Sequence, residues 1–342
     1  MKIELNLDFK IPIWRFFYGT DYNIPWQFEF NGIEYRNYIC IIFLGWCGES
    51  CLINDKNFLM ENKILEKFTT NHIICFPTQK GVDLCRQLRP KLNCCLASHN
   101  SFIDESLYKI DLNYKFNYNM IVSSAFATYK NLHVLENTNN VLGVGYGLDR
   151  PYGYFHPTNV KILDFTDENN TDVEKERIKE NYRRIDPADM VKFINSSKIG
   201  GMFSEVEGSC YSSGEYLLCG IPVLTCKCTG GRESFYNSNN SVICELTKES
   251  VKEKVDYMLE NYDKFDRNQI REDHIKIMEI QRDNLTNSVL NIWHKIDNTP
   301  PNFEELKESL KQYHSNNFGS SITYLYEKQT IRELTAHKVL KL

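Results

Sequence analysis

Short, almost wholly apolar runs recur along the chain and are separated by longer polar segments. They fall at residues 38–44, 72–76, 92–97, 118–125, 141–147, 161–165, 199–204 and 221–224. Runs of this length are typical of strands that are buried on both faces of a parallel sheet. Several of the intervening segments have helical spacing, and the alternation of strand and helix predicts an α/β fold.

Helical patterns account for much of the remaining chain. The predicted helices span residues 80–88, 173–184, 187–195, 250–262 and 302–313. Residues 266–296 carry a longer helical pattern, which we interpret as two segments. The aromatic-rich residues 1–36 predict an irregular segment with a short strand or two.

Length and composition indicate two globular domains. At 342 residues the chain is long enough for two domains that each bury a core. Apolar residues make up 42% and charged residues 25% of the chain, which are ordinary globular values and exclude wholesale disorder. The net charge of −5, without a long basic run, argues against a nucleic-acid partner. An anionic ligand would therefore be held by local positive groups rather than by the overall field.

The twelve cysteines and the hydropathy bear on the compartment. Because no signal peptide is recognisable, we expect reduced thiols and a cytoplasmic location. Spacings such as Cys47-x3-Cys51 and Cys226-x-Cys228 do not match a zinc ribbon or finger, so no metal site is predicted. No apolar run approaches the ~20 residues of a membrane span. Peripheral contact with a membrane-bound acceptor stays open.

The segment 202–236 carries the densest candidate chemistry. It begins with the end of an apolar run, continues through a polar turn of small residues, and reaches a short apolar block that stops at Gly220 and Pro222. This order predicts strand, loop, short helix and stop. A second buried strand leads into a tight loop with Gly230 and Gly231. In an open α/β sheet, ligands bind at loops that follow the carboxyl ends of adjacent strands.

The first of these loops offers groups that suit a nucleotide sugar. Backbone N–H groups of residues 210–213 would lie at a helix N-terminus, where unpaired donors and the macrodipole favour a diphosphate. Glu207 and Glu215 flank that anion site, and carboxylates accept hydrogen bonds from vicinal hydroxyls. The alternative is a capping box, in which Glu215 bonds back to the N–H of Ser212.

Three elements in order resemble the donor site of retaining family 4 glycosyltransferases. They are Glu207-x7-Glu215, the Cys-Gly-Ile-Pro-Val sequence at 219–223, and the pair Gly230-Gly231. The resemblance implies a GT-B fold, in which two Rossmann-like domains face a cleft. The first domain is abbreviated here.

This resemblance also implies a division of the chain. We expect an acceptor-side Rossmann-like domain at 1–116 and a nucleotide-sugar-binding Rossmann-like domain at 117–282. The C-terminal helices at 283–342 would pack back on the first domain.

By the same resemblance, each residue of the motif acquires an expected role. Glu215 would hold the ribose hydroxyls, and Glu207 would orient the transferred sugar. Lys130 would neutralise the diphosphate, although a solvated surface lysine is the alternative. The main-chain donors to the sugar and diphosphate would come from Gly208, Ser209, Cys210, Tyr211, Ser212 and Ser213.

The chain departs from the family's pattern at two positions. Ala125 stands where the family has an arginine. Arg232, beside the glycine pair, could supply the missing guanidinium. The family often has a glutamate three residues after the double glycine, where this chain has Ser234, while Glu233 comes one residue early.

Two segments of the first domain are further candidates for the cleft. His99 and Asn100 resemble the segment by which the family crosses between domains, and a capping or interface role is the alternative for the histidine. Gly45 and Gly48 follow the strand at 38–44, where a plain strand-to-helix turn is the alternative. The family's catalytic histidine in this domain has no clear counterpart.

We therefore predict a retaining, metal-independent glycosyltransferase of the hexosyltransferase type. The donor would be a UDP- or GDP-linked sugar, the acceptor a hydroxyl of a glycan or of a lipid-linked or protein-linked glycoconjugate, and no cofactor is expected. One alternative is a catalytically inactive subunit that binds a nucleotide sugar or a glycan. Another is an NAD-dependent oxidoreductase resting on Gly143-x-Gly145, which Leu148 weakens because it replaces the third glycine.

Overall fold

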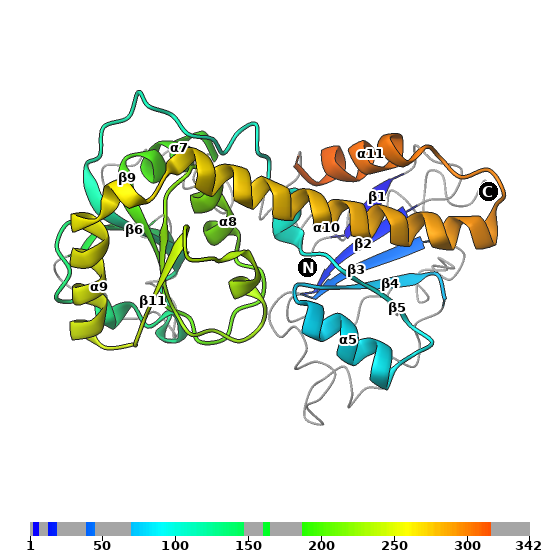
Figure 1. Ribbon diagram of the computed structural model, residues 1–342, viewed down its shortest axis with the longest axis horizontal. Coiled ribbons are helices and arrows are strands. Elements are labelled where there is room, and N and C mark those ends of the chain that lie inside the picture. Colours follow the sequence, from blue (N-terminus) through cyan, green and yellow to red (C-terminus); the bar gives the residue numbers. More distant parts are fainter. Residues whose placement is uncertain are drawn as a thin grey trace, which may run out of the picture. The chain divides into compact units, whose positions relative to one another are not determined.

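The computed structural model describes residues 3–6, 13–18, 39–44, 70–146, 160–164 and 187–315. The chain divides into two compact units, each built around its own sheet (Figure 1). Unit 1 comprises Met1–Phe102, Glu207–Ser209 and Met278–Leu342, and unit 2 comprises Ile103–Val206 and Cys210–Ile277. The division falls after Phe102, earlier than the boundary expected between residues 116 and 117.

Unit 1 contains a five-stranded sheet in the order β1-β2-β3-β4-β5. Its strands are β1 (Ile3–Asn6), β2 (Ile13–Tyr18), β3 (Ile39–Leu44), β4 (His72–Phe76) and β5 (Asn93–Leu96). Only β1 runs antiparallel, and the pairs from β2 to β5 are parallel. Helix α5 (Gln79–Leu88) connects β4 to β5 and is capped by Thr78, whose hydroxyl accepts from the N–H of Gly81 at 3.1 Å.

Helices cover both faces of this sheet (Figure 1). On one face, strands β3, β4 and β5 share a buried core with α10 (Arg267–Ile296) and α11 (Phe303–Ser315). The helical members of that core are Leu285, Val289, Ile292, Trp293, Leu306 and Leu310. On the other face lies α5, where a Cβ on Gly81 would approach the Phe76 ring to 2.7 Å. The close approach explains why a glycine stands in the first turn of α5.

Unit 2 contains a six-stranded sheet in the order β11-β10-β9-β6-β7-β8. All of its paired strands run parallel. The strands are β6 (Tyr118–Ala125), β7 (Val141–Tyr146), β8 (Val160–Asp164), β9 (Ser197–Met202), β10 (Val223–Cys226) and β11 (Ser241–Cys244). The associated helices are α7 (Pro187–Asn195), α8 (Tyr211–Leu218) and α9 (Lys248–Glu260). Two sheets with helices confirm the predicted α/β class.

The interpretation of residues 266–296 as two helical segments is wrong. A single helix of 30 residues, α10, forms there instead. The sequence of α10 holds neither glycine nor proline, so nothing in it breaks the backbone hydrogen bonds. The helix contributes residues 267–277 to unit 2 and residues 278–296 to unit 1.

Some sequence predictions fall outside the described ranges. The candidates Gly45 and Gly48 lie there, as does the helix expected at 173–184. Among the helices that the structure does describe, including the long α10, none is apolar enough over a sufficient length to cross a membrane.

Candidate functional site

The order of strands in unit 2 places a switch point between β6 and β9. From β6 the chain adds β7 and β8 on one side and then returns to add β9, β10 and β11 on the other. Ligands of open α/β sheets bind outside the carboxyl ends of the strands at such a point. Pairing of β6 with β9 ends at Ile121 and Gly200, whereas pairing with β7 continues to Ala125. The two strands at the switch point therefore separate before β6 ends.

Helix α8 provides hydrogen-bond partners for the backbone of β6 where this strand no longer pairs with β9. The N–H of Ser123 donates to the Tyr216 hydroxyl at 2.7 Å, and the Ser212 hydroxyl donates to the carbonyl of Ser123 at 2.9 Å. Gly200 makes room for the ring, since a Cβ there would lie 2.2 Å from Tyr216 Cδ2. These contacts fix the first turns of α8 against the carboxyl end of β6.

The N-terminus of α8 is left without a side-chain cap. Its N-cap is Cys210, in extended conformation, and within the described part of the chain no side-chain hydrogen bond from this residue caps the first turn. The serines that follow are engaged elsewhere, because the Ser213 hydroxyl bonds with the Tyr236 hydroxyl at 2.8 Å and Ser212 reaches β6. The positive end of the helix dipole thus stands at the switch point, an arrangement suited to an anion.

The capping-box alternative for Glu215 is wrong. A capping box would require Ser212 to be the N-cap, but α8 has already begun at Tyr211 and the Ser212 hydroxyl bonds to Ser123. The Glu215 carboxylate instead accepts a hydrogen bond from the Tyr108 hydroxyl. Glu215 is half-buried, and its desolvation raises the pKa of the carboxyl to about 7 despite the opposing effect of Tyr108.

Tyr108 is a site residue that the sequence did not reveal. It is buried, and this burial together with the nearby Glu215 charge raises the pKa of its phenol. Its backbone is held by Arg271 of α10, whose Nη1 donates to the Tyr108 carbonyl at 2.6 Å and also to the Leu218 carbonyl. The residue lies in an irregular segment, and no periodic pattern there marks its partner.

Helix α8 ends before Gly220, as the sequence predicted. Gly220 has φ of +71°, and the N–H groups of Gly220 and Ile221 donate to the carbonyls of Leu217 and Tyr216 at 3.0 Å each. This pattern is a Schellman motif. A Cβ on Gly220 would also lie 2.6 Å from the Arg267 carbonyl, so both conformation and space require glycine.

The second glycine loop follows β10 and is hydrogen-bonded to the segment after β9, where the N–H of Thr229 donates to the Glu205 carbonyl at 2.9 Å. Gly230 and Gly231 have φ of +123° and +120°, and Arg232 follows them as the first residue of a 3₁₀ helix. The Arg232 side chain is fully buried, and its Nη2 donates to the Ser204 carbonyl and to Thr225 Oγ1, both at 3.0 Å. In the described ranges its Nε and Nη1 have no hydrogen-bond partner. One nitrogen of the guanidinium is therefore committed to the protein, while two other buried donors lack a hydrogen-bond partner within the described ranges.

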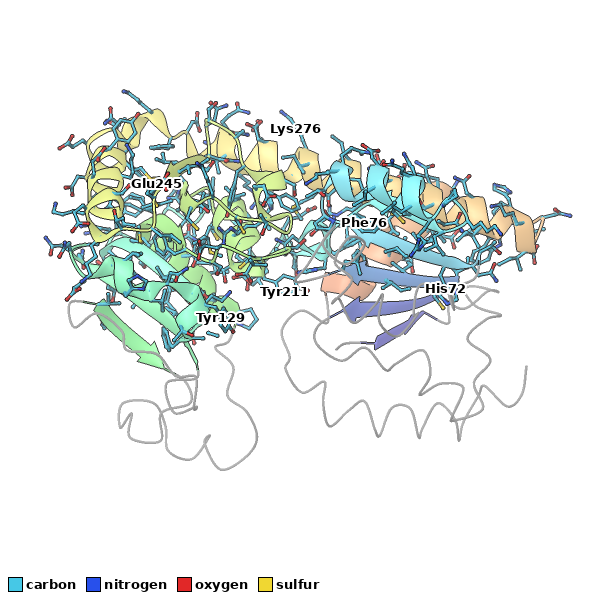
Figure 2. The ribbon with its side chains drawn as sticks, turned by 90° about the horizontal axis from the view of Figure 1, so that it is seen from below. His72, Phe76, Tyr129, Tyr211, Glu245 and Lys276 are labelled. Carbon is cyan, nitrogen blue, oxygen red and sulfur yellow. The ribbon has the colours of Figure 1, made fainter. Side chains whose placement is uncertain are left out.

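Lys130 comes from the loop after β6. It ends a 3₁₀ helix at Thr128–Lys130, and its Nζ lies 5.5 Å from the centroid of the Tyr129 ring. The side chain is buried, which argues against the solvated-lysine alternative. The next residue, Asn131, has φ of +52° and donates through its amide to the Phe203 carbonyl at 3.0 Å, tying this loop to the end of β9. Figure 2 labels Tyr129, which precedes Lys130 in the 3₁₀ helix, and Tyr211, the first residue of α8.

The remaining predicted residues belong to unit 1. Glu207, Gly208 and Ser209 group with that unit, and the Ser209 hydroxyl is hydrogen-bonded to the Ser98 hydroxyl. Glu207 is buried. Lys130, Cys210 to Ser213, Glu215 and Gly230 to Arg232 thus belong to unit 2, whereas Glu207 to Ser209, His99 and Asn100 belong to unit 1.

His99 is buried in the short 3₁₀ helix His99–Phe102. Burial lowers the pKa of its imidazole to about 4, although a hydrogen bond with the Ser209 backbone opposes that shift. The ring is therefore neutral at pH 7. Asn100 is fully buried as well, and its N–H donates to Ser98 Oγ at 3.1 Å.

The described residues hold no group of three or more His, Cys, Asp or Glu side chains arranged to bind a metal ion.

Comparisons with known proteins identify the fold. No protein-family model matches the sequence, and no curated protein matches it either. The solved structure of TarM is similar, with 16% identity, a TM-score of 0.50, and coverage of 79% of this chain and 52% of TarM. The chain thus spans about half the length of TarM. The α,α-trehalose 6-phosphate synthase from Burkholderia multivorans shares 9% identity, with a TM-score of 0.50 and coverage of 79% and 69%. Likenesses at such identities show the fold, which is the GT-B fold of two Rossmann-like units.

Proposed function

We propose that this protein is a retaining glycosyltransferase, resembling family 4, that moves a sugar from a nucleoside diphosphate sugar to a hydroxyl. The observation that carries the proposal is the N-terminus of α8, which has no side-chain cap and is anchored at the switch point between β6 and β9. Glu215 lies one turn further along the same helix. The fold agrees with the proposal, since an α,α-trehalose 6-phosphate synthase has a similar fold.

The diphosphate is proposed to bind at the first turn of α8. Main-chain N–H groups of residues 210–213 would donate to the phosphate oxygens, and the helix dipole would favour their negative charge. Lys130, one loop away after β6, supplies a full positive charge. Arg232 adds a buried guanidinium with Nε and Nη1 uncommitted among the described residues. An overall net charge of −5 makes such local cations necessary.

Glu215 is proposed to accept hydrogen bonds from the two ribose hydroxyls. Two carboxylate oxygens can each accept from one of two neighbouring hydroxyls. The Tyr108 hydroxyl already donates to this carboxylate, so it fixes the orientation in which the oxygens meet the ribose. Tyr108 therefore acts as a positioning residue.

In the proposed reaction, the bond between the anomeric carbon of the sugar and the diphosphate oxygen breaks. The acceptor oxygen bonds to the same face of that carbon, and the proton of the acceptor hydroxyl passes to the leaving diphosphate. The amides of α8 and the Lys130 ammonium stabilise the charge that develops on the leaving diphosphate. Glu207 orients the sugar rather than attacking it. The donor is a UDP- or GDP-linked sugar, the acceptor is a glycan or a lipid-linked or protein-linked glycoconjugate, and neither a metal nor a cofactor takes part.

A catalytically inactive subunit that binds a nucleotide sugar is the second candidate. Two observations favour it. Ala125, at the end of β6, stands where the family has an arginine. Arg232 already uses its Nη2 to bind the Ser204 carbonyl and Thr225 Oγ1. Turnover separates the two candidates, since only the enzyme releases a nucleoside diphosphate from a matching donor.

The proposal is tested first by thermal shift with UDP, GDP and CDP, and then with sugars linked to whichever nucleotide stabilises the protein. A ligand at 100 times its dissociation constant should stabilise the protein by about 2.7 kcal/mol. With the matching donor, transfer should persist in EDTA, and NMR should show the product with the anomeric configuration of the donor. An inverted product, or strict dependence on added manganese, would reject this mechanism.

A further inference from the structure

Two pairs of thiols lie on opposite faces of strands β4 and β5 in unit 1. Cys75 and Cys95 are partners in the parallel register, with their Sγ atoms 3.8 Å apart, and both belong to the core shared with α10 and α11. Cys94 precedes Cys95 on β5, so its side chain points to the other face. That face carries α5, which contributes Cys85. Figure 2 labels Phe76, the residue at the end of β4 against which α5 packs.

The pair beneath α5 differs from the pair in the core by its exposure. Cys94 is half-buried and reachable from solvent, whereas Cys85 behind it is fully buried. Cys85 lies on the buried face of α5 together with Gly81 and Val82. The Cys94 thiol donates to the Val82 carbonyl at 3.7 Å, one turn earlier than Cys85 on α5, and this contact holds the Cys94 sulfur against that face. Both thiols of the other pair, Cys75 and Cys95, are buried.

The charges around the pair favour a thiolate at Cys94. The hydrogen bond from Cys85 and the neighbouring Arg86 guanidinium lower the pKa of the Cys94 thiol to about 7, against the opposing effects of its partial burial and of Asp83. The same hydrogen bond and burial raise the pKa of Cys85. On the other face, burial and the adjacent thiols raise the pKa of Cys75. Because the thiolate is the reactive form, Cys94 is set apart from the buried pair.

We propose that Cys94 and Cys85 form a peroxide-sensitive dithiol, in which Cys94 is the attacking residue and Cys85 the resolving one. The Cys94 thiolate attacks one oxygen of hydrogen peroxide, forming an S–O bond, breaking the O–O bond and releasing hydroxide. The Cys85 sulfur then attacks the Cys94 sulfenic acid, forming the disulfide, while the Cys85 proton and the sulfenic hydroxyl leave as water. The link would join the last turn of α5 to β5, and it does not depend on the nucleotide site of unit 2.

The direct test is oxidation of the full-length protein with hydrogen peroxide, followed by alkylation of free thiols and mass spectrometry of peptides kept unreduced. We expect a disulfide between the peptides that hold Cys85 and Cys94. In Cys85→Ser, dimedone should trap a sulfenic acid on Cys94, because the resolving thiol is gone. Cys75→Ser is the control on the opposite face and should leave the link intact. The proposal is overturned if Cys94 stays reduced, if it oxidises without linking to Cys85, or if Cys75 and Cys95 link to the same extent.

A second measurement on the unaltered protein covers the case in which the Cys85 variant does not fold. The alkylation rate of each thiol by iodoacetamide is followed against pH. Cys94 should react with a midpoint near pH 7 and, at pH 7, about tenfold faster than an ordinary thiol of pKa about 8.5. Arg86→Leu should move the midpoint upward. A Cys94 midpoint at or above about 8.5 contradicts the proposal.

Discussion

The loop after β5 in unit 1 and the loop before α8 in unit 2 both follow the carboxyl end of a parallel strand, yet their polar groups are satisfied differently. In unit 1, Gln281 of α10 accepts from the Ser98 N–H at 2.7 Å and from the Ser101 hydroxyl at 2.6 Å. Arg282 Nε donates to the Ser101 carbonyl at 2.6 Å. The long helix therefore supplies hydrogen-bond partners to this loop from its own side chains.

In unit 2, α10 makes hydrogen bonds to the C-terminus of α8, the end away from the proposed phosphate site. Arg267 and Arg271 donate to the carbonyls of Cys219 and Leu218 at the C-terminus of α8. At the N-terminus, Ser212 and Ser213 direct their hydroxyls to β6 and to Tyr236 rather than to the first-turn amides. A loop whose donors are already paired is a structural connection, whereas a helix N-terminus that is anchored but not capped can receive an anion. This difference supports the proposal that the phosphate site lies in unit 2.

The largest effect is expected from Gly200→Ala, which disturbs the anchoring of α8. The new Cβ would lie 2.2 Å from the ring of Tyr216, which is fully buried and hydrogen-bonded to Ser123. We expect a loss of about 3 kcal/mol in the free energy of unfolding, measured by urea denaturation. In a Tyr216→Ala background the same substitution should cost much less, because the clash is gone. An equal cost in both backgrounds would show that the ring is not the obstacle.

Glu215→Gln should produce the next largest effect, on nucleotide binding. Loss of the charged acceptor for the ribose hydroxyls should cost about 2 kcal/mol, or about thirtyfold in affinity for the nucleoside diphosphate, by calorimetry. Glu207→Gln should leave that affinity nearly unchanged and lower turnover, because Glu207 is proposed to touch only the sugar. Glu249→Gln, exposed on α9, is the control. Normal nucleotide affinity in Glu215→Gln would remove the ribose assignment.

Lys130→Ala should weaken binding of the nucleoside diphosphate by about tenfold while leaving the free nucleoside unaffected, because a charge-assisted phosphate contact is lost. The exposed Lys192 on α7 provides the matched control, Lys192→Ala. Equal losses for diphosphate and nucleoside would place Lys130 away from the phosphates.

The smallest effect concerns pH. Burial raises the pKa of the Glu215 carboxyl to about 7. The protonated carboxyl therefore adds to the free energy of unfolding at acid pH, and this contribution is lost as the pH rises through about 7. Ribose binding needs the carboxylate, and nucleoside affinity should therefore rise about twofold between pH 7 and pH 8. Using the free nucleoside avoids titration of the phosphate itself. The rise should vanish in Glu215→Gln, and an identical rise in that variant would point to another titrating group.

The sequence predicted the parts of this site that depend on local pattern. Apolar runs gave the strands β6, β9 and β10, and Gly220 correctly marked the end of α8. Tyr108 and Glu215 are in contact although they are far apart in the chain. The local sequence around neither residue predicts this contact. The grouping of Glu207 to Ser209 with unit 1 was missed for the same reason, since it depends on long-range partners such as Ser98.

Amide NMR during titration with the stabilising nucleoside diphosphate tests the central claim most directly. The protein is labelled with ¹⁵N on serine and tyrosine, and the Ser212, Ser213 and Tyr211 resonances of the α8 N-terminus are followed. We expect these three amides to shift as the ligand saturates the protein, because its phosphate oxygens accept their hydrogen bonds. Saturable binding that leaves all three resonances unmoved would contradict the assignment of the phosphate site to α8.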